Sequence, residues 1–140
     1  MKKVLIAIDN EPSAERVALH GFQMGNQLNA EIAILSVVDT RLMMTTGNVT
    51  AKEMIQAIKN ELMKFHSALT EKFSSDKPVV TFIEQGNPYE VILESAKQWS
   101  ADLIVMGTHG RTGLTHLLMG SVAEKVIRHS TIQVLIVPNK

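Results

Sequence analysis

The sequence contains no cysteine among its 140 residues. Disulfide bridges, thiolate catalysis and zinc sites built on sulfur are therefore excluded. The chain also has no excess of charge, because 14 Lys and Arg residues balance 14 Asp and Glu residues. A neutral chain without a basic run argues against nucleic acid or an anionic membrane as the main partner. Low net charge does little to keep copies apart and is compatible with self-association.

Long hydrophobic runs are also missing. No segment approaches the roughly 18 apolar residues that a membrane helix needs. Two lysines precede an apolar run near the N-terminus, as in a signal peptide, but this run covers only Val4–Ile8 and then meets Asp9. That run is too short for the core of a signal peptide. The sequence therefore predicts a soluble, cytoplasmic protein with no membrane partner.

Apolar runs and amphipathic stretches alternate along the chain. Short apolar runs, rich in β-branched residues, predict strands at residues 4–8, 31–38, 78–83, 103–106 and 134–137. Apolar residues at three- and four-residue steps predict a helix after each of the first four runs. Such alternation predicts a three-layer, Rossmann-like α/β/α fold with a parallel sheet. The length is that of one domain, so we expect a single domain over residues 1–140.

Local signals predict where several helices begin. Pro12 is expected in the first turn of the first helix. The segment NPYE at 87–90 resembles the start of a capping box, and another helix is expected to begin with GS at 120–121. Residues 39–50 form the one long irregular segment, and loops of that length are often functional or mobile. Three histidines on helices are expected at the surface or its boundary: His20, His66 and His129.

Ligands of an open parallel sheet bind at the carboxyl ends of its strands, where the strand order reverses. The expected ends carry aspartates or glycines, namely Asp9, Asp39, Gly86 and Gly107. The richest end is the segment GTHGR at 107–111, in which two glycines enclose polar side chains and an arginine follows. Glycine lets the backbone take unusual dihedral angles and approach a ligand closely.

A helix start follows at Gly120-Ser121, with nine residues between it and Gly110. The free N–H groups of a helix start and the helix dipole favour an anion. The Ser121 hydroxyl is placed to cap the helix and to touch a phosphate oxygen. Each glycine by itself can be an ordinary turn residue, and the serine only a cap. Their grouping beside one strand end favours an anion site, and specifically one for phosphates.

These residues form a recognisable pattern, G-x2-G-x9-G-S over residues 107–121. The pattern resembles the nucleotide-binding motif of the universal stress protein family, in its ATP-binding branch. The resemblance extends over the whole chain. It includes VLIAIDNEPSAERVAL near the N-terminus, SVVD at 36–39, and in the second half both GNPYEVILESAKQWSADLIVMGTHGRTG and LLMGSVAEKVIRHSTIQVLIVP.

The resemblance implies an adenine nucleotide alpha hydrolase-like fold with strand order 3-2-1-4-5. It implies ATP, AMP or a related adenine nucleotide as the ligand. Magnesium usually arrives with its nucleotide, and Asp9 and Asp39 are the carboxylates that could meet it. Asp9 would also accept hydrogen bonds from the ribose, with a helix cap as the alternative. Val37 would meet the adenine largely through its backbone, with plain core packing as the alternative.

Further contacts to the nucleotide are implied by the same resemblance. Ala7 and Ile8 would line the cleft, and Met106 would pack near the nucleotide or serve only as a core residue. Arg111 is either a phosphate neighbour or a solvated side chain. Ala123 stands where the family often has Ser or Thr, which implies weaker phosphate binding. The residues expected around the phosphates are Gly107, His109, Gly110, Gly120, Ser121 and Val122.

Signals for catalysis are weak. The chain has no Walker lysine motif and no nucleophile elbow, and no further ligands at metal-binding spacing accompany His109 and His116. We assign no catalytic and no metal-binding residues and expect at most slow ATP hydrolysis. The main hypothesis is a stress or signalling switch, in which the nucleotide orders residues 39–50 and 110–120. One alternative is a hydrolase or transferase that uses His109 with Asp9; another is a dimeric stress protein that binds no nucleotide.

The last apolar run, Val134–Val137, comes at the end of the implied strand order. An uncovered apolar edge strand is a surface for association. We predict a homodimer that pairs this strand across a two-fold axis, which is also the habit of the family. The alternative is an edge covered by the chain's own tail, Asn139-Lys140, which is short.

Overall fold

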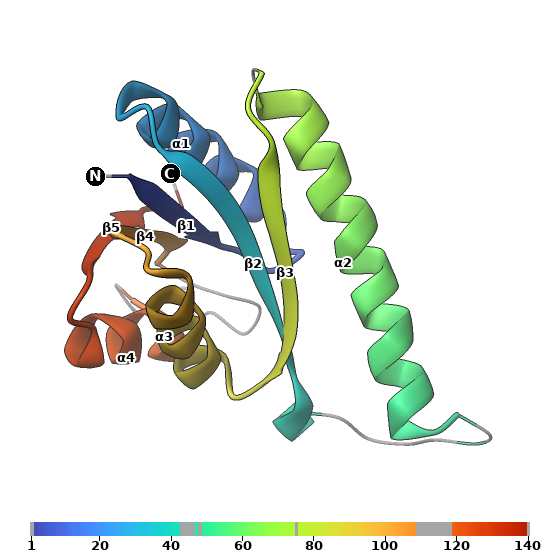
Figure 1. The fold of residues 1–140 in the computed structure, drawn as a ribbon. Helices are drawn as coiled ribbons and strands as arrows, with labels where there is room; N and C mark the ends of the chain where they lie inside the picture. Colours follow the sequence, from blue (N-terminus) through green and yellow to red (C-terminus); the bar gives the residue numbers. More distant parts are fainter. Residues whose placement is uncertain (1, 43–46, 48, 75, 109–118, 140) are drawn as a thin grey trace.

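The computed structural model describes residues 2–42, 47, 49–74, 76–108 and 119–139. Five parallel strands form one sheet in the order β3-β2-β1-β4-β5, with helices on both faces (Figure 1). The predicted fold class and strand order are confirmed. The strands are β1 (Lys3–Ala7), β2 (Glu31–Asp39), β3 (Val79–Gly86), β4 (Leu103–Gly107) and β5 (Gln133–Val137). The helices are α1 (Ala14–Gln27), α2 (Ala51–Phe73), α3 (Pro88–Trp99) and α4 (Ser121–His129), with the short 3-10 helix η1 (Thr40–Leu42) after β2.

The core consists of two apolar clusters, one on each face of the sheet. Neighbouring residues of β1 alternate between them: Val4 and Ile6 belong to one cluster, Leu5 and Ala7 to the other. The first is called here the α1/α2-side cluster and the second the α3/α4-side cluster, after the helices that contribute to each. The central strands read as continuous apolar runs because helices cover both of their faces.

Helix α1 lies close to the sheet because two glycines, one turn apart, face it. A Cβ atom on Gly21 would stand 2.6 Å from Cδ1 of Ile6, and one on Gly25 would stand 2.6 Å from Cδ1 of Ile32. Both isoleucines are buried. Any side chain at either glycine would therefore have to push the helix away from the strands.

Helix α2 begins with a capping box that the sequence analysis missed. Thr50 Oγ1 accepts a hydrogen bond from the Glu53 N–H at 3.1 Å, and Glu53 Oε1 accepts one from the Thr50 N–H at 3.2 Å. This box satisfies two N–H groups at the helix start. The helix is 23 residues long and amphipathic. Among the described residues, no helix is both long enough and apolar enough to cross a bilayer.

The predicted start of α3 at residues 87–88 is confirmed, but two details predicted at helix starts were wrong. Asn87 is the N-cap of α3 but makes no side-chain bond to the backbone; its Nδ2 donates to Glu90 Oε1 at 3.3 Å. Pro12 lies before α1, in a turn closed by the Ala14 N–H and the Glu11 carbonyl at 2.9 Å. Both helices nevertheless begin within two residues of the predicted positions, since the apolar periodicity fixes them independently of the caps.

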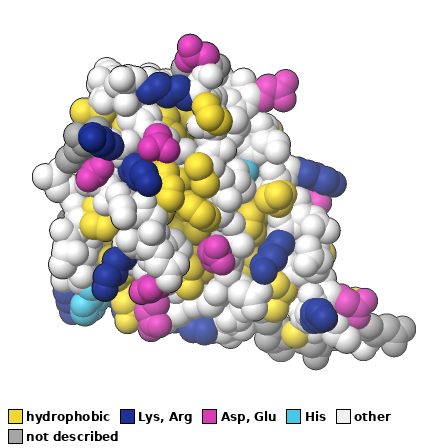
Figure 2. All heavy atoms as spheres, in the orientation of Figure 1, with side chains coloured by type: hydrophobic (Ala, Val, Ile, Leu, Met, Phe, Trp, Pro, Cys, Tyr) yellow, Lys and Arg dark blue, Asp and Glu magenta, His cyan; other side chains and the backbone are white. Residues whose placement is uncertain are grey.

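The two edges of the sheet differ in how well helices cover them. On the β3 edge most residues are exposed or half-buried, and Val80 is 37% exposed. Figure 2 shows hydrophobic side chains at the surface of the face on which β3 is seen in Figure 1. On the β5 edge Val134 to Ile136 are half-buried and Val137 is buried. The predicted edge position of β5 is confirmed by the strand order.

Candidate functional site

The carboxyl ends of β1, β2 and β4 lie side by side at the point where the strand order reverses. Ala7 is paired with Leu35 of β2 on one side and with Met106 of β4 on the other. The side chains of Ala7 and Met106 belong to the α3/α4-side cluster, and Val37 packs against that cluster. The structure thus brings together three residues that the sequence analysis had assigned to one cleft.

Ile8 lies apart from these side chains. Its N–H continues the β1–β2 ladder by donating to the Leu35 carbonyl at 3.0 Å. Its side chain, however, belongs to the α1/α2-side cluster on the opposite face of the sheet. Ile8 can therefore contribute only its backbone to a site formed by the side chains of Ala7 and Met106.

A backbone hydrogen bond links the residue after β4 to the residue before α4. Thr108 follows Gly107, and its N–H donates to the Val137 carbonyl of β5 at 3.3 Å. The Thr108 carbonyl in turn accepts the Gly120 N–H at 2.7 Å. The first bond anchors Thr108 to β5, and the second holds Gly120, which precedes α4, beside the residue that follows Gly107. The chain between them is the segment in which the predicted contacts His109, Gly110 and Arg111 lie, outside the described residues, as does His116.

At the start of α4, no side chain from the described part of the chain caps the backbone N–H groups. Gly120 is the N-cap, with φ −75° and ψ 168°, and within the described residues no side-chain hydrogen bond caps this helix start. Ser121 is the first helical residue and is exposed, so the prediction that its hydroxyl caps the helix was wrong. Val122 packs against the α3/α4-side cluster and Ala123 is buried in it. First-turn N–H groups of a nine-residue helix, left open in this way, favour an anion.

Asp9 directly follows the buried end of β1 and is half-buried. Its Oδ1 accepts a hydrogen bond from the Glu11 N–H at 3.0 Å. The carboxylate thus stabilises the turn that leads into α1. This contact is not the helix cap that the sequence analysis named as the alternative to a role at the ribose, because the N-cap of α1 is Ser13.

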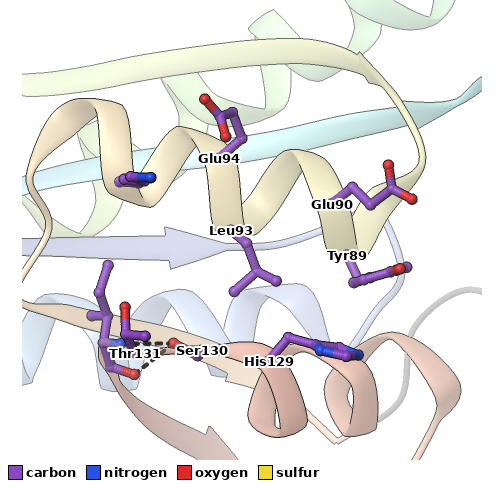
Figure 3. A pocket seen from close by; sticks show the side chains of 9 residues that line it. Tyr89, Glu90, Leu93, Glu94, His129, Ser130 and Thr131 are labelled. Carbon is purple, nitrogen blue, oxygen red and sulfur yellow. Dashed lines mark hydrogen bonds between the residues drawn. The ribbon is translucent and has the colours of Figure 1, made fainter.

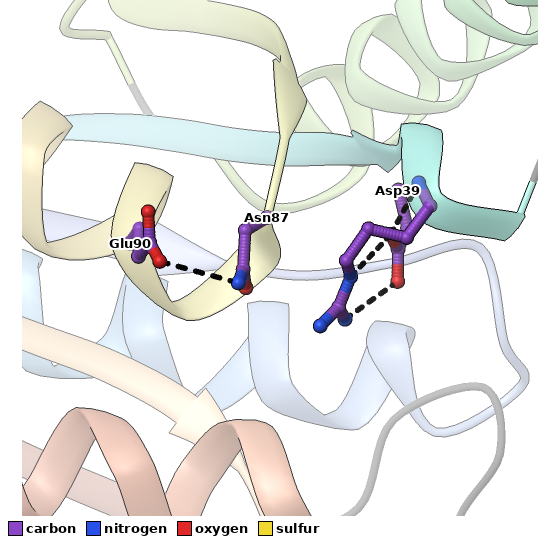
Figure 4. Close-up of polar contacts among 4 residues, drawn as sticks. Asp39, Asn87 and Glu90 are labelled. Carbon is purple, nitrogen blue, oxygen red and sulfur yellow. Dashed lines mark hydrogen bonds and ion pairs between the residues drawn. The ribbon is translucent and has the colours of Figure 1, made fainter.

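Asp39 at the end of β2 is paired with Arg41 of η1 (Figure 4). Arg41 Nε donates to Oδ1 and Nη2 donates to Oδ2, both at 3.0 Å. These hydrogen bonds hold the pKa of the Asp39 carboxyl below its usual value. The sequence analysis did not identify Arg41, although a basic residue two positions after a strand-end aspartate is a readable signal. A magnesium ion at Asp39 would have to displace this guanidinium.

The buried pair of Ser36 and His66 is a second feature that the sequence analysis missed. Both residues are 1% exposed, and Ser36 Oγ lies 2.7 Å from His66 Nε2. The prediction that His66 lies at the surface or its boundary was wrong. The readable signal was spacing, because His66 stands four residues after Leu62 and three before Leu69, on the buried stripe of α2.

A separate groove of about 380 Å³ lies between α3 and the end of α4 (Figure 3). Tyr89 and His129 face each other across it with ring centroids 5.8 Å apart, and Lys125 Nζ lies 5.2 Å from the centre of the Tyr89 ring. Its lining residues belong to α3, α4 and the connection to β5. None of these lining residues belongs to the strand ends described above.

Comparison of the sequence with known families gives one decisive match. The sequence profile of the universal stress protein family matches residues 1–138. The chain belongs to the universal stress protein family. Universal stress protein MJ0531 of Methanocaldococcus jannaschii is 33% identical over 138 residues, which cover 97% of this chain and 81% of that protein. Universal stress protein YxiE of Bacillus subtilis is 32% identical over 145 residues, which cover 96% of this chain and 97% of that protein.

Solved structures share the fold of this universal stress protein. The structure of protein MJ0577 superimposes with a TM-score of 0.85 and 28% identity, covering 99% of this chain and 96% of that one. A universal stress protein in complex with cAMP gives a TM-score of 0.76 at 20% identity, covering 99% and 98%. The universal stress protein of Archaeoglobus fulgidus in complex with dAMP gives 0.65 at 19% identity, covering 97% of each chain. The last two likenesses concern the fold alone.

The described part of this universal stress protein gathers no group of three or more His, Cys, Asp or Glu side chains that could hold a metal ion.

Proposed function

We propose that this universal stress protein binds an adenine nucleotide at the carboxyl ends of β1, β2 and β4. The observation that carries the proposal is the bond from the Gly120 N–H to the Thr108 carbonyl, which places Gly120 near Gly107, beside a helix start that no side chain of the described residues caps. Support also comes from two proteins of the same fold whose structures contain cAMP and dAMP. We take ATP as the first candidate, because the sequence resembles the ATP-binding branch, with AMP and other adenine nucleotides as further candidates.

The proposed contacts divide by position. The apolar floor, made by Ala7, Val37 and Met106, takes the adenine, and the backbone of Ile8 borders it. Asp9, whose Oδ1 accepts the Glu11 N–H, binds the ribose. The phosphates are held by backbone N–H groups and side chains of Gly107, His109, Gly110, Arg111, Gly120, Ser121 and Val122. Any Mg²⁺ is held mainly by the phosphates, since Asp39 is engaged by Arg41.

The proposed consequence of binding is a switch in the surface shown to a protein partner, with little or no ATP turnover. We place the protein in the cytoplasm, where adenine nucleotides are abundant, and regard residues 1–140 as one domain. We further propose a homodimer formed through β5, whose edge position allows its backbone to pair with a second copy. A stress-response role follows from membership of the family and is part of the proposal.

The test is isothermal titration calorimetry with ATP and Mg²⁺, and with AMP and cAMP, on the wild type and on Gly120→Val. Gly120 has φ −75°, which any residue can adopt, so the valine variant is expected to fold. Its side chain would stand between the helix start and a phosphate. We expect at least a tenfold loss of ATP affinity, which corresponds to about 1.4 kcal/mol.

The matched control is Gln23→Ala, on the exposed side of α1, which should bind ATP as the wild type does. Mass spectrometry of the denatured protein would identify any nucleotide that co-purifies. Absence of binding by the wild type at millimolar nucleotide would contradict the proposal, and so would unchanged binding by Gly120→Val.

A further inference from the structure

Three polar groups form a buried chain across the α1/α2 face of the sheet. Ser36 Oγ donates a hydrogen bond to the Ile8 carbonyl at 2.8 Å and lies 2.7 Å from His66 Nε2. Ser36 belongs to β2, His66 to the middle of α2, and Ile8 is the first residue after β1. These hydrogen bonds therefore connect a helix on one face of the sheet to the strand end at which the proposed nucleotide site begins.

The protons of this chain can be assigned by counting donors. A serine hydroxyl has one hydrogen, and here it points to the Ile8 carbonyl. Ser36 must then accept from His66, so Nε2 carries the proton and Nδ1 does not. Nδ1 is buried and has no hydrogen-bond partner among the described residues. A second proton on this ring would find no acceptor in the described part of the chain, which agrees with burial lowering the pKa of His66 to about 4.

An unpartnered buried nitrogen is unfavourable, and an apolar pair could fill the same space without that cost. Local costs of this kind are expected beside functional sites, where a fixed geometry matters more than stability. The group whose geometry is fixed here is the Ile8 carbonyl.

The orientation of the Ile8 carbonyl determines that of the next peptide unit. The N–H and the carbonyl of Ile8 both bond toward β2, the first to the Leu35 carbonyl and the second to Ser36. The Ile8–Asp9 peptide bond is trans and planar. The N–H of Asp9 therefore points to the other side of β1, where β4 lies. That side contains the end of β4 and Gly107.

We infer that Ser36 and His66 are positioning residues of the nucleotide site: by holding the Ile8 carbonyl they fix the peptide plane that directs Asp9 toward the nucleotide. Neither side chain touches the ligand, since both are buried on the opposite face of the sheet. This inference rests on the proposed nucleotide-binding function.

The test compares two substitutions at one position. Ser36→Ala removes the hydroxyl, and Ser36→Thr keeps it in a residue that suits a strand. Titration with ATP and Mg²⁺, and separately with AMP, should show about three- to tenfold weaker binding by Ser36→Ala, the effect of one neutral hydrogen bond. Ser36→Thr should restore binding to near the wild-type value. In NMR spectra the Asp9 amide resonance should shift in Ser36→Ala and return in Ser36→Thr.

Leu69→Ala controls for general loss of stability. It truncates a buried side chain of α2 one turn from His66 and leaves the hydrogen-bonded chain intact. It should lower the melting temperature at least as much as Ser36→Ala and leave nucleotide affinity unchanged. If Ser36→Ala does not fold, the pair His66→Leu and His66→Gln replaces it, because only glutamine can still donate to Ser36.

The outcomes separate the inference from the function on which it rests. A wild type that binds none of the nucleotides overturns the proposed function and the inference together. A wild type that binds, with Ser36→Ala binding equally well, overturns the inference alone. Equal weakening in Ser36→Ala and Leu69→Ala also overturns it, because the effect would then be one of stability. Weaker binding in Ser36→Ala, restored by Ser36→Thr, supports it.

Discussion

At the scale of single residues, His66 shows how burial changes the chemistry of a side chain. An imidazole in water titrates near pH 6.5, whereas burial lowers the pKa of His66 to about 4. The ring is therefore neutral in the folded protein at neutral pH, and it acts as a hydrogen-bond donor to Ser36. This role requires one tautomer, which the two bonds of the Ser36 hydroxyl select.

His66 should make the stability of the protein depend on pH. Between pH 6.5 and pH 4 the unfolded chain binds a proton at this residue and the folded chain does not. The free energy of unfolding should therefore fall as the pH is lowered through this range, by roughly 3 kcal/mol from this residue alone. Above pH 6.5 the contribution is fully present. Urea denaturation at several pH values measures it.

The variants for this experiment are His66→Gln and His129→Gln. The first removes the titrating group, so its stability should depend less steeply on pH between 4 and 6.5 than that of the wild type. The second removes an exposed histidine and should leave the steeper dependence in place. Parallel curves for the wild type and His66→Gln would show that His66 does not titrate in this way.

At the scale of elements, the position of α1 depends on the absence of side chains at two points. Alanine in place of Gly21 would favour the helix by about 1 kcal/mol through propensity. Its Cβ would, however, stand 2.6 Å from two atoms of Ile6, which is fully buried and cannot move aside freely. Overpacking of this kind typically costs about 1–3 kcal/mol.

Gly21→Ala should therefore destabilise the protein, by up to about 2 kcal/mol, although the same change stabilises most exposed helix positions. Thermal and urea unfolding would measure the difference from the wild type. Gln23→Ala, two residues away on the exposed side of the helix, should change stability by less than about 0.5 kcal/mol. A higher melting temperature for Gly21→Ala would mean that α1 can move away from the sheet without loss.

The elements around the proposed site also show how far sequence reasoning extends. The positions of Ala7, Val37 and Met106 on one face of the sheet, near the carboxyl ends of their strands, follow from strand alternation, which the apolar runs reveal directly. The side chain of Ile8 lies on the opposite face because successive side chains along a strand point to opposite faces. The sequence analysis overlooked this, because it assigned the neighbouring residues Ala7 and Ile8 to the same side of the cleft. The capping box at Thr50 and Glu53 was readable in the sequence as well.

At the scale of the whole molecule, the sheet has two edges that a second copy could meet. The β5 edge is formed by apolar, half-buried residues, and the β3 edge is more exposed. We expect dimerisation through β5, so size-exclusion chromatography with light scattering should give twice the monomer mass at micromolar concentration.

Substitution of one residue by lysine on each edge strand tests which edge forms the dimer. Leu135→Lys places a charge on β5 and should give a monomer, because a charged edge strand resists pairing. Val80→Lys places the same charge on β3 and should leave the dimer intact. Circular dichroism confirms that each variant is folded. A wild type that is monomeric, or a dimer lost only in Val80→Lys, would contradict pairing through β5.

The sequence by itself determined the order and type of the elements, because apolar periodicity is a local property that survives in any packing of the chain. It also located the glycines and the aspartate at the strand ends. The burial of His66 was readable from its place on the apolar stripe of α2, but only the tertiary structure decided what the buried polar side chains bind. Ser36 and His66 stand 30 positions apart, and their hydrogen bond exists because α2 packs on β2. Contacts between distant segments depend on how helices pack on a sheet, which no local pattern specifies.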